Sequence, residues 1–404
     1  MSDSPHRLYD RNFLIAFVSQ TCFVGANTLM AHYARWIEFL GGDLREVGFI
    51  MGVCALLGLL LRPWMAQLIN RFGARAMWGV GYAMFIGSSA ANLALTDLGP
   101  WIYLVRSSLV LGTAIVFASG LTYITQTTPE DRRTEAIGIF GIGGFLGMII
   151  GPFVGDLFLD QRTYESFANL FLLASAANVL PMLGLFLLRS SESGGKDTSL
   201  KLSEFIAVSR RFWPGTILLV DFAFGVCMAA PFIFVASFID DAGLHLPGLS
   251  VIGIFFVCYA GLAIAIRLAT RRLPDRIGAP RVLLTGAIFM SMGMACFALV
   301  DSSRPWLIIV PALMAGVGHG LMFHTMVSLT LRSFPSEVRG TGTAIALIML
   351  DLGTIVGAPI LGWIGESFGF AALFISIGTF CMLSCACYGI KHYESWKIEN
   401  QYAK

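Results

Sequence analysis

Several ionisable side chains inside long apolar stretches of the sequence could do chemistry. The foremost are two acids, Asp221 and Asp351, one arginine, Arg106, and two histidines, His319 and His324. Burial disfavours the charged form of a carboxyl group, so such a group can bind and release a proton when its access to water changes. An arginine does not discharge cheaply in lipid and must face a water-filled space or a partner. These residue types therefore predict chemistry based on the movement of protons or ions.

The composition indicates that these residues lie in a membrane. Of the 404 residues, 56% are hydrophobic and 13% are charged. A soluble domain has roughly 25% charged residues, so the composition excludes a mainly soluble enzyme, a disordered chain and a disulfide scaffold. The formal net charge of +2 gives no indication of nucleic-acid binding. The eight cysteines all lie within apolar stretches, which predicts buried thiols rather than a metal site.

The apolar runs predict an all-α membrane protein with twelve spanning helices. The runs start near Phe13, Val47, Ala76, Trp101, Ala136, Ser166, Phe212, Leu249, Val282, Trp306, Thr341 and Phe370. The only long polar connection divides the chain into a six-helix bundle over 1–188, a cytoplasmic linker over 189–211 and a second six-helix bundle over 212–404. Asp43 and Glu46 have the spacing of a capping box at a helix start.

The distribution of lysine and arginine predicts the orientation in the membrane. Most of the 27 basic residues fall in every second connecting segment, and only Arg35, Arg45, Arg162 and Arg304 fall in the others. Because basic residues accumulate on the cytoplasmic side, both termini are expected to be cytoplasmic. The predicted location is the cell membrane, which is the inner membrane if the source is a bacterium.

Several short segments recur about half a chain apart. Asn70-Arg71-Phe72-Gly73 returns 205 positions later as Asp275-Arg276-Ile277-Gly278, and Gly147 and Gly151 return 206 positions later as Gly353 and Gly357. This offset brings the chain back to the same side of the membrane after six spans. The two bundles are therefore predicted to be parallel, pseudo-symmetric copies.

The loop after the second run resembles the loop motif G-x-x-x-D-R-x-G-R-K/R of the major facilitator superfamily. Arg71, Gly73 and Arg75 match it, whereas Ala66 and Asn70 replace the leading glycine and the acid. The resemblance extends over essentially the whole chain and implies the two-bundle fold of that superfamily. It also implies a cytoplasmic gating loop made of Asn70, Arg71, Gly73, Asp275, Arg276 and Gly278. The alternative is that these arginines only obey the charge rule in a tight turn.

The fifth run resembles the antiporter motif of the same superfamily. It contains Gly147, Gly151, Pro152 and Gly155, followed by Asp156 where the family has glycine. In the family this motif is associated with export. Its glycines allow close helix packing and its proline allows bending, so we expect this helix to pack against the other half and to shift during transport. A purely structural packing face is the alternative.

The resemblance also implies which residues meet the substrate, because the first, fourth, seventh and tenth helices line the cavity in this family. The predicted cavity residues are Asn27, His32, Tyr33, Ser119, Tyr123 and Phe224. Asp221 and Arg106 are the favoured coupling pair, although Arg106 has the alternative of extending to the membrane surface. Asp351 contributes either to coupling or to a structural hydrogen bond. His319 and His324 contact protons or substrate, or else are neutral core histidines.

Together these features predict a secondary transporter that works by alternating access. The favoured interpretation is proton-coupled antiport that exports a small amphipathic organic molecule, with the proton gradient as the energy source, no cofactor and no metal. One alternative is a proton-coupled importer or uniporter of a metabolite, and another is a non-transporting receptor or assembly factor. Enzymatic activity is not expected, since no Ser-His-Asp or phosphate-binding pattern stands near a membrane face. The expected partners are the substrate, protons and lipid, and the chain is expected to be a monomer.

Overall fold

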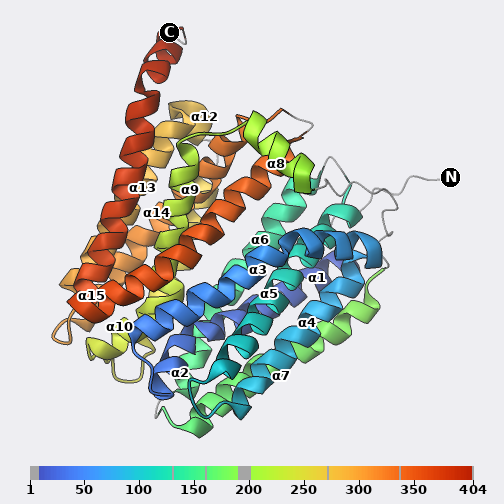
Figure 1. Cartoon of the computed structure of the whole chain (residues 1–404), viewed down its shortest axis with the longest axis vertical. Helices are drawn as coiled ribbons and strands as arrows, with labels where there is room; N and C mark the ends of the chain where they lie inside the picture. Colours follow the sequence, from blue (N-terminus) through green and yellow to red (C-terminus); the bar gives the residue numbers. More distant parts are fainter. Residues whose placement is uncertain are drawn as a thin grey trace. The chain divides into compact units, whose positions relative to one another are not determined.

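The computed structural model describes residues 9–129, 132–159, 162–189, 202–270, 273–335 and 338–402, and nearly all of them are helical (Figure 1). In this part of the chain, 10 helical segments are long and apolar enough to cross a membrane. The last of these, Thr341–His392, holds two spans because Gly369 breaks helix α15 with φ 82. Together with α4 (Ala74–Ala91), whose composition is less apolar, this gives the twelve spans that the sequence predicts.

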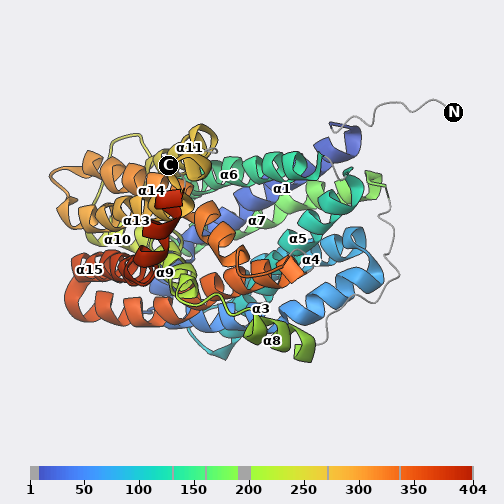
Figure 2. The same cartoon turned by 90° about the horizontal axis from the view of Figure 1, so that it is seen from above.

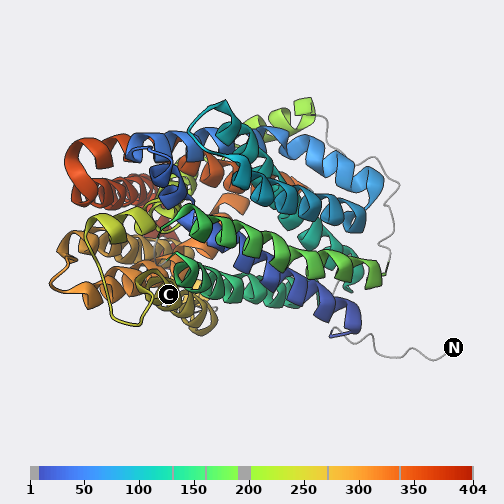
Figure 3. The same ribbon diagram turned by 90° about the horizontal axis from the view of Figure 1, so that it is seen from below.

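The chain forms two compact units. The first comprises Met1–Gly42 and Val53–Ser199, and the second comprises Asp43–Gly52 and Leu200–Lys404. The start of α3 therefore belongs to the second unit. Figures 2 and 3 show from two further sides that the helices of each unit lie alongside one another.

The first unit contains six spans. Its helices are α1 (Arg11–Leu29), α2 (Tyr33–Phe39), α3 (Leu44–Phe72) from Val53 onward, α4, α5 (Pro100–Thr127), α6 (Arg133–Phe158) and α7 (Tyr164–Gly184). A short 3-10 segment, η1 (Met30–His32), joins α1 to α2, so that Arg11–Phe39 forms one span. The prediction that Arg35 lies in a loop is therefore wrong. The polar residues around it lower the local hydropathy without ending the helical span.

The second unit repeats this arrangement. Its helices are α8 (Leu202–Arg211), α9 (Ile217–Ala229), α10 (Val235–Asp241), α11 (Val251–Ala269), α12 (Leu273–Ile277), α13 (Ala279–Cys296), α14 (Ile309–Leu331) and α15 (Arg339–Tyr402). One π-helical turn, η5 (Ala230–Phe234), joins α9 to α10 and contains Pro231. Within the predicted linker, residues 190–201 lie outside the described part. Helix α8 follows them and packs Phe205 and Val208 against Leu218 and Phe334.

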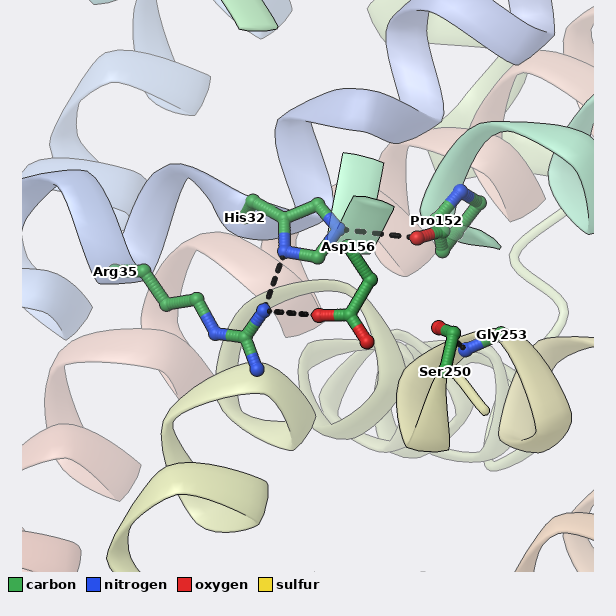
Figure 4. Close-up of polar contacts among 6 residues, drawn as sticks. All are labelled: His32, Arg35, Pro152, Asp156, Ser250 and Gly253. Atoms are coloured by element: carbon green, nitrogen blue, oxygen red, sulfur yellow. Dashed lines mark hydrogen bonds and ion pairs between the residues drawn. The ribbon is translucent and has the colours of Figure 1, made fainter. Parts of the chain in front are cut away.

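Local side-chain caps fix where several helices begin. The predicted capping box at the start of α3 is confirmed: Asp43 N donates to Glu46 Oε2 at 3.1 Å, and Glu46 N donates to Asp43 Oδ1 at 2.9 Å. At the start of α11, the Ser250 hydroxyl oxygen accepts a hydrogen bond from Gly253 N at 2.9 Å (Figure 4). Such caps satisfy amide groups that a helix start otherwise leaves without partners.

The predicted repeat also appears in the backbone geometry. Gly73 connects α3 to α4 with φ 85 and ψ 148, and Gly278 connects α12 to α13 with φ 88 and ψ 134. Because a side chain at such positive φ is strained, both turns require glycine. The next helix pairs match as well: a Cβ at Gly112 would lie 2.9 Å from Phe85 N, and one at Gly318 would lie 2.7 Å from Met290 N. The same close helix contact is therefore built twice.

Candidate functional site

The glycine face of α6 packs against α1 of the same unit. A Cβ at Gly147 would lie 2.6 Å from Gly25 N, and one at Gly151 would overlap Gly25 O and the Thr28 hydroxyl. Thr28 Oγ1 also donates to Gly147 O at 3.1 Å across the two helices. These glycines therefore pack within the first unit, and the expectation that the helix also packs against the other half stays a prediction.

The second unit contains an equivalent glycine contact. A Cβ at Gly353 of α15 would overlap Phe222 O of α9, and one at Gly225 would overlap Leu350 O. Thr354 Oγ1 donates to Gly225 O at 2.8 Å, much as Thr28 does in the first unit. Because both units contain such a contact, close packing of glycines alone does not indicate a direction of transport.

A chain of polar contacts lies at the end of this glycine face in the first unit (Figure 4). Arg35 NH1 lies 2.9 Å from Asp156 Oδ1 and 2.9 Å from His32 Nδ1. His32 Nε2 lies 3.2 Å from Pro152 O. His32 and Arg35 are 0% and 5% exposed, and Asp156 is 24% exposed. Gly155 is required here, because a Cβ at this position would lie 2.5 Å from His32 Cδ2.

The hydrogen-bond partners determine the protonation state of His32. A carbonyl oxygen only accepts, so His32 Nε2 must donate to Pro152 O. A guanidinium only donates, so His32 Nδ1 must accept from Arg35. His32 is therefore neutral, with its hydrogen on Nε2, and Arg35 NH1 donates one hydrogen to the histidine and the other to the Asp156 carboxylate.

The sequence interpretation did not identify this group as a unit. His32 was expected to line the cavity, Arg35 was placed in a loop, and Asp156 was treated only as a departure from the antiporter motif. The sequence contained one indication of this group. Asp156 stands where the antiporter motif has glycine, and a carboxylate at such a position requires a basic partner. The partner is 121 residues away in the sequence, so spacing alone could not reveal it.

Arg106 is buried in the first unit with 9% of its surface exposed. Its guanidinium carbon lies 4.4 Å from the centre of the Tyr33 ring, an arrangement that stabilises a cation. Among the described residues, its Nε and NH1 have no hydrogen-bond partner. Arg106 therefore packs inside the first unit beside Tyr33, and its role in coupling stays a prediction.

Asp221 is 0% exposed on α9 in the second unit. Its Oδ2 accepts a hydrogen bond from Thr330 Oγ1 of α14 at 2.8 Å, and Oδ1 has no partner among the described residues. The described part of the chain also shows no ion pair to this carboxyl. The carboxyl thus lies inside a membrane-spanning helix with one hydrogen-bond partner among the described residues.

The histidines of α14 lie among aromatic rings of the second unit. His319 Nδ1 lies 2.5 Å from the Tyr259 hydroxyl, and its ring meets Phe224 edge-on at 5.2 Å between centroids. His324 is half-buried on the same helix, with its ring 5.5 Å from that of Phe323. Phe224, predicted to line the cavity, therefore contacts a predicted proton or substrate residue.

The remaining predicted site residues have other surroundings. Asn27 Oδ1 accepts from Thr113 Oγ1 at 3.0 Å, and the Tyr123 hydroxyl donates to Arg189 O at 3.3 Å. Ser119 is buried on α5, and Asp351 is half-buried on α15.

The gating-loop residues are only partly described. The side chains of Arg71 and Arg276 are exposed, whereas those of Asn70 and Asp275 lie outside the described part of the structure. Within that part, no group of His, Cys, Asp or Glu has an arrangement that could hold a metal ion, and the eight cysteines are free thiols.

Comparison with known proteins shows the family to which the chain belongs. The family model described as Major Facilitator Superfamily matches residues 12–351 and 250–399, and the chain belongs to that superfamily. It is 25% identical to "Multidrug resistance protein MdtG" of Citrobacter koseri, covering 92% of each chain. It is 23% identical to the protein of the same name from Salmonella arizonae, covering 92% of this chain and 93% of that one.

A solved structure supports the fold. The crystal structure of a mutant of the nucleoside transporter NupG matches with a TM-score of 0.77 and 12% identity, covering 93% of this chain and 98% of that chain. At this identity the likeness concerns the fold alone. The twelve-helix, two-bundle architecture predicted from the sequence is thus confirmed, and the protein is a transporter of the Major Facilitator Superfamily.

Proposed function

We propose that the protein exports a small amphipathic organic molecule in exchange for protons. The observation that carries the proposal is Asp221, a fully buried carboxyl group without an ion pair in the described part of the chain. The names of the relatives support export as the direction, since both are called multidrug resistance proteins. The proposed location is a cell membrane, with both termini in the cytoplasm as the charge distribution predicts.

In this mechanism Asp221 binds a proton when its surroundings open to one side of the membrane and releases it on the other. The hydroxyl of Thr330 holds the carboxyl in place through both steps. Arg106 contributes a fixed positive charge in the other bundle, where its unfilled donors suit an anionic or polar group of the substrate. The two bundles expose the substrate site alternately, as expected for this fold.

Replacing Asp221 with asparagine tests the proposal, because the amide oxygen can still accept from Thr330 but the side chain cannot bind a proton. The assay uses the lipophilic cation ethidium in proteoliposomes, with the membrane potential held at zero by potassium and valinomycin. We expect Asp221→Asn to lower proton-driven accumulation of ethidium about tenfold for each pH unit of imposed gradient, since each coupled proton contributes that factor. Ethidium exchange without a gradient should persist.

Asp241→Asn is the matched control, because Asp241 ends the same span but is exposed. It should behave as the unmodified protein. Unchanged proton-driven accumulation in Asp221→Asn would remove Asp221 from the mechanism. Absence of proton-driven accumulation in the unmodified protein, together with substrate-independent proton flux, would contradict antiport itself.

A further inference from the structure

We propose that His32, in the first unit, is a second proton-binding site. The proton binds to Nδ1 and there replaces the hydrogen bond that Arg35 donates. The inference rests on the proposed function, since it names a further residue that takes part in proton coupling. Its basis is the set of contacts that His32 makes with Arg35, Asp156 and Pro152 (Figure 4).

The first step of the argument is that His32 has one basic nitrogen still able to take a proton. Nε2 already carries hydrogen, which it donates to Pro152 O, whereas the lone pair of Nδ1 accepts from Arg35 NH1. A proton from water can therefore bond only to Nδ1. When it does, the hydrogen bond from Arg35 is lost, because Nδ1 and the guanidinium are then both donors. The charge of the site rises by one, and the displaced Arg35 also gives up its ion pair with Asp156, which His32 takes over.

The charges around His32 determine the consequence. The groups that face it are Arg35 on its own helix segment, Asp156 of α6, the carbonyl of Pro152, and Arg162 from the connection after α6. A protonated His32 would repel both arginines and attract Asp156. Protonation therefore favours movement of Arg35 away and a contact between His32 and the carboxylate. Asp156 can pair with Arg35 when His32 is neutral and with His32 when it is protonated, so the carboxylate has a cationic partner in both states.

His32 lies where its change of hydrogen-bond partner can affect helices α1, α2 and α6. It is the last residue of η1, the 3-10 segment where α1 gives way to α2. Short 3-10 segments inside longer helices often mark hinges. Its other hydrogen bond reaches α6 at Pro152, where the helix lacks a backbone donor and bends most readily. A change of partner at His32 thus acts where both helices are least constrained.

Asp156 is the most exposed of the three side chains in this group. Asp156 is 24% exposed, whereas His32 and Arg35 are nearly fully buried. The carboxylate is therefore the group through which a proton would pass between solvent and His32 Nδ1. This arrangement also explains why an acid stands where the motif has glycine.

Glutamine at position 32 separates proton binding from structure. Its amide nitrogen can donate to Pro152 O and its oxygen can accept from Arg35, so it imitates the neutral histidine without titrating. In the ethidium assay described above, we expect His32→Gln to retain exchange within about twofold. Its proton-driven accumulation should fall about tenfold per pH unit of gradient, as expected from the loss of one coupled proton. His245→Gln, which changes an exposed histidine in a loop of the second unit, is the control.

Accumulation by His32→Gln equal to that of the unmodified protein and of His245→Gln would overturn the inference while leaving the proposed function intact. Failure of the unmodified protein to couple ethidium to protons would contradict the proposed function instead. In that case a second measurement tests whether His32 binds a proton.

This second measurement uses nuclear magnetic resonance of the full chain in lipid nanodiscs, with ¹⁵N-labelled histidine. One signal at alkaline pH should show a neutral ring with hydrogen on Nε2 and be absent from His32→Gln. On acidification it should become the signal of a doubly protonated ring. A signal that stays neutral at every pH at which the protein remains folded would contradict proton binding at His32.

Discussion

Replacement of Asp156 with alanine is expected to destabilise the protein by about 3 kcal/mol, because it removes the carboxylate that pairs with the buried Arg35. The ion pair has a distance of 2.9 Å, and Arg35 is only 5% exposed. A guanidinium in such surroundings cannot lower the free-energy cost of burying its charge by losing a proton. The value lies at the low end for a broken buried pair, since the partial exposure of Asp156 admits some water. The change is measured as a lower midpoint of thermal unfolding in detergent, followed by tryptophan fluorescence.

A double variant distinguishes the loss of the pair from the loss of packing. Replacing both charges with apolar residues, Arg35→Met with Asp156→Leu, leaves no uncompensated charge and should recover most of the stability. His32 keeps its hydrogen bond to Pro152 O in this variant. Equal destabilisation by the single and the double variant would show that Arg35 does not depend on Asp156.

Gly151→Ala is expected to have the second large effect. The added methyl group would overlap the carbonyl oxygen of Gly25 and the hydroxyl of Thr28, and a backbone atom cannot turn aside as a flexible side chain can. Helices α1 and α6 would have to separate. Overpacking of this kind costs about 1–3 kcal/mol or more, so the unfolding midpoint should fall and less folded protein should reach the membrane.

Gly141→Ala is a matched control on the same helix. A Cβ at Gly141 meets no atom within 4 Å. Alanine is favoured over glycine in a helix by about 1 kcal/mol, so this variant should be as stable as the unmodified protein or more so. The two substitutions are thus expected to have opposite signs. Comparable midpoints for Gly151→Ala and Gly141→Ala would contradict the close contact between α1 and α6.

The spans and the repeat could be predicted because their signals are local. A run of apolar residues long enough to cross a bilayer has few other interpretations, and the predicted starts lie within a few residues of the observed helices. The turns at Gly73 and Gly278 follow from residue type and spacing, and the structure gives both the same positive φ. The polar cap formed by Asp43 and Glu46 was predictable for the same reason.

The chemistry of the first unit was harder to predict because it depends on contacts between distant segments. Arg35 follows several polar residues, so hydropathy suggested a loop where the span in fact continues to Phe39. The glycines of α6 revealed that a close neighbour exists but not which helix it is. The π-helical turn over Ala230–Phe234 was also absent from the prediction, because proline alone does not specify how a helix accommodates it.

The central claim is that two parallel copies of one six-helix bundle form an alternating-access transporter. The most direct test labels engineered thiols in the two repeated turns, Arg71→Cys and Arg276→Cys, with a membrane-impermeant maleimide. Both side chains are exposed. Asp97→Cys, which lies in the exposed connection between α4 and α5, is the control for the opposite side, and the unmodified protein gives the background of native thiols.

In spheroplasts, we predict that the reagent labels Asp97→Cys but neither Arg71→Cys nor Arg276→Cys. In inverted membrane vesicles the pattern should reverse. Labelling of Arg71→Cys and Arg276→Cys from opposite sides of the membrane would contradict parallel copies, and with them the proposed transport cycle.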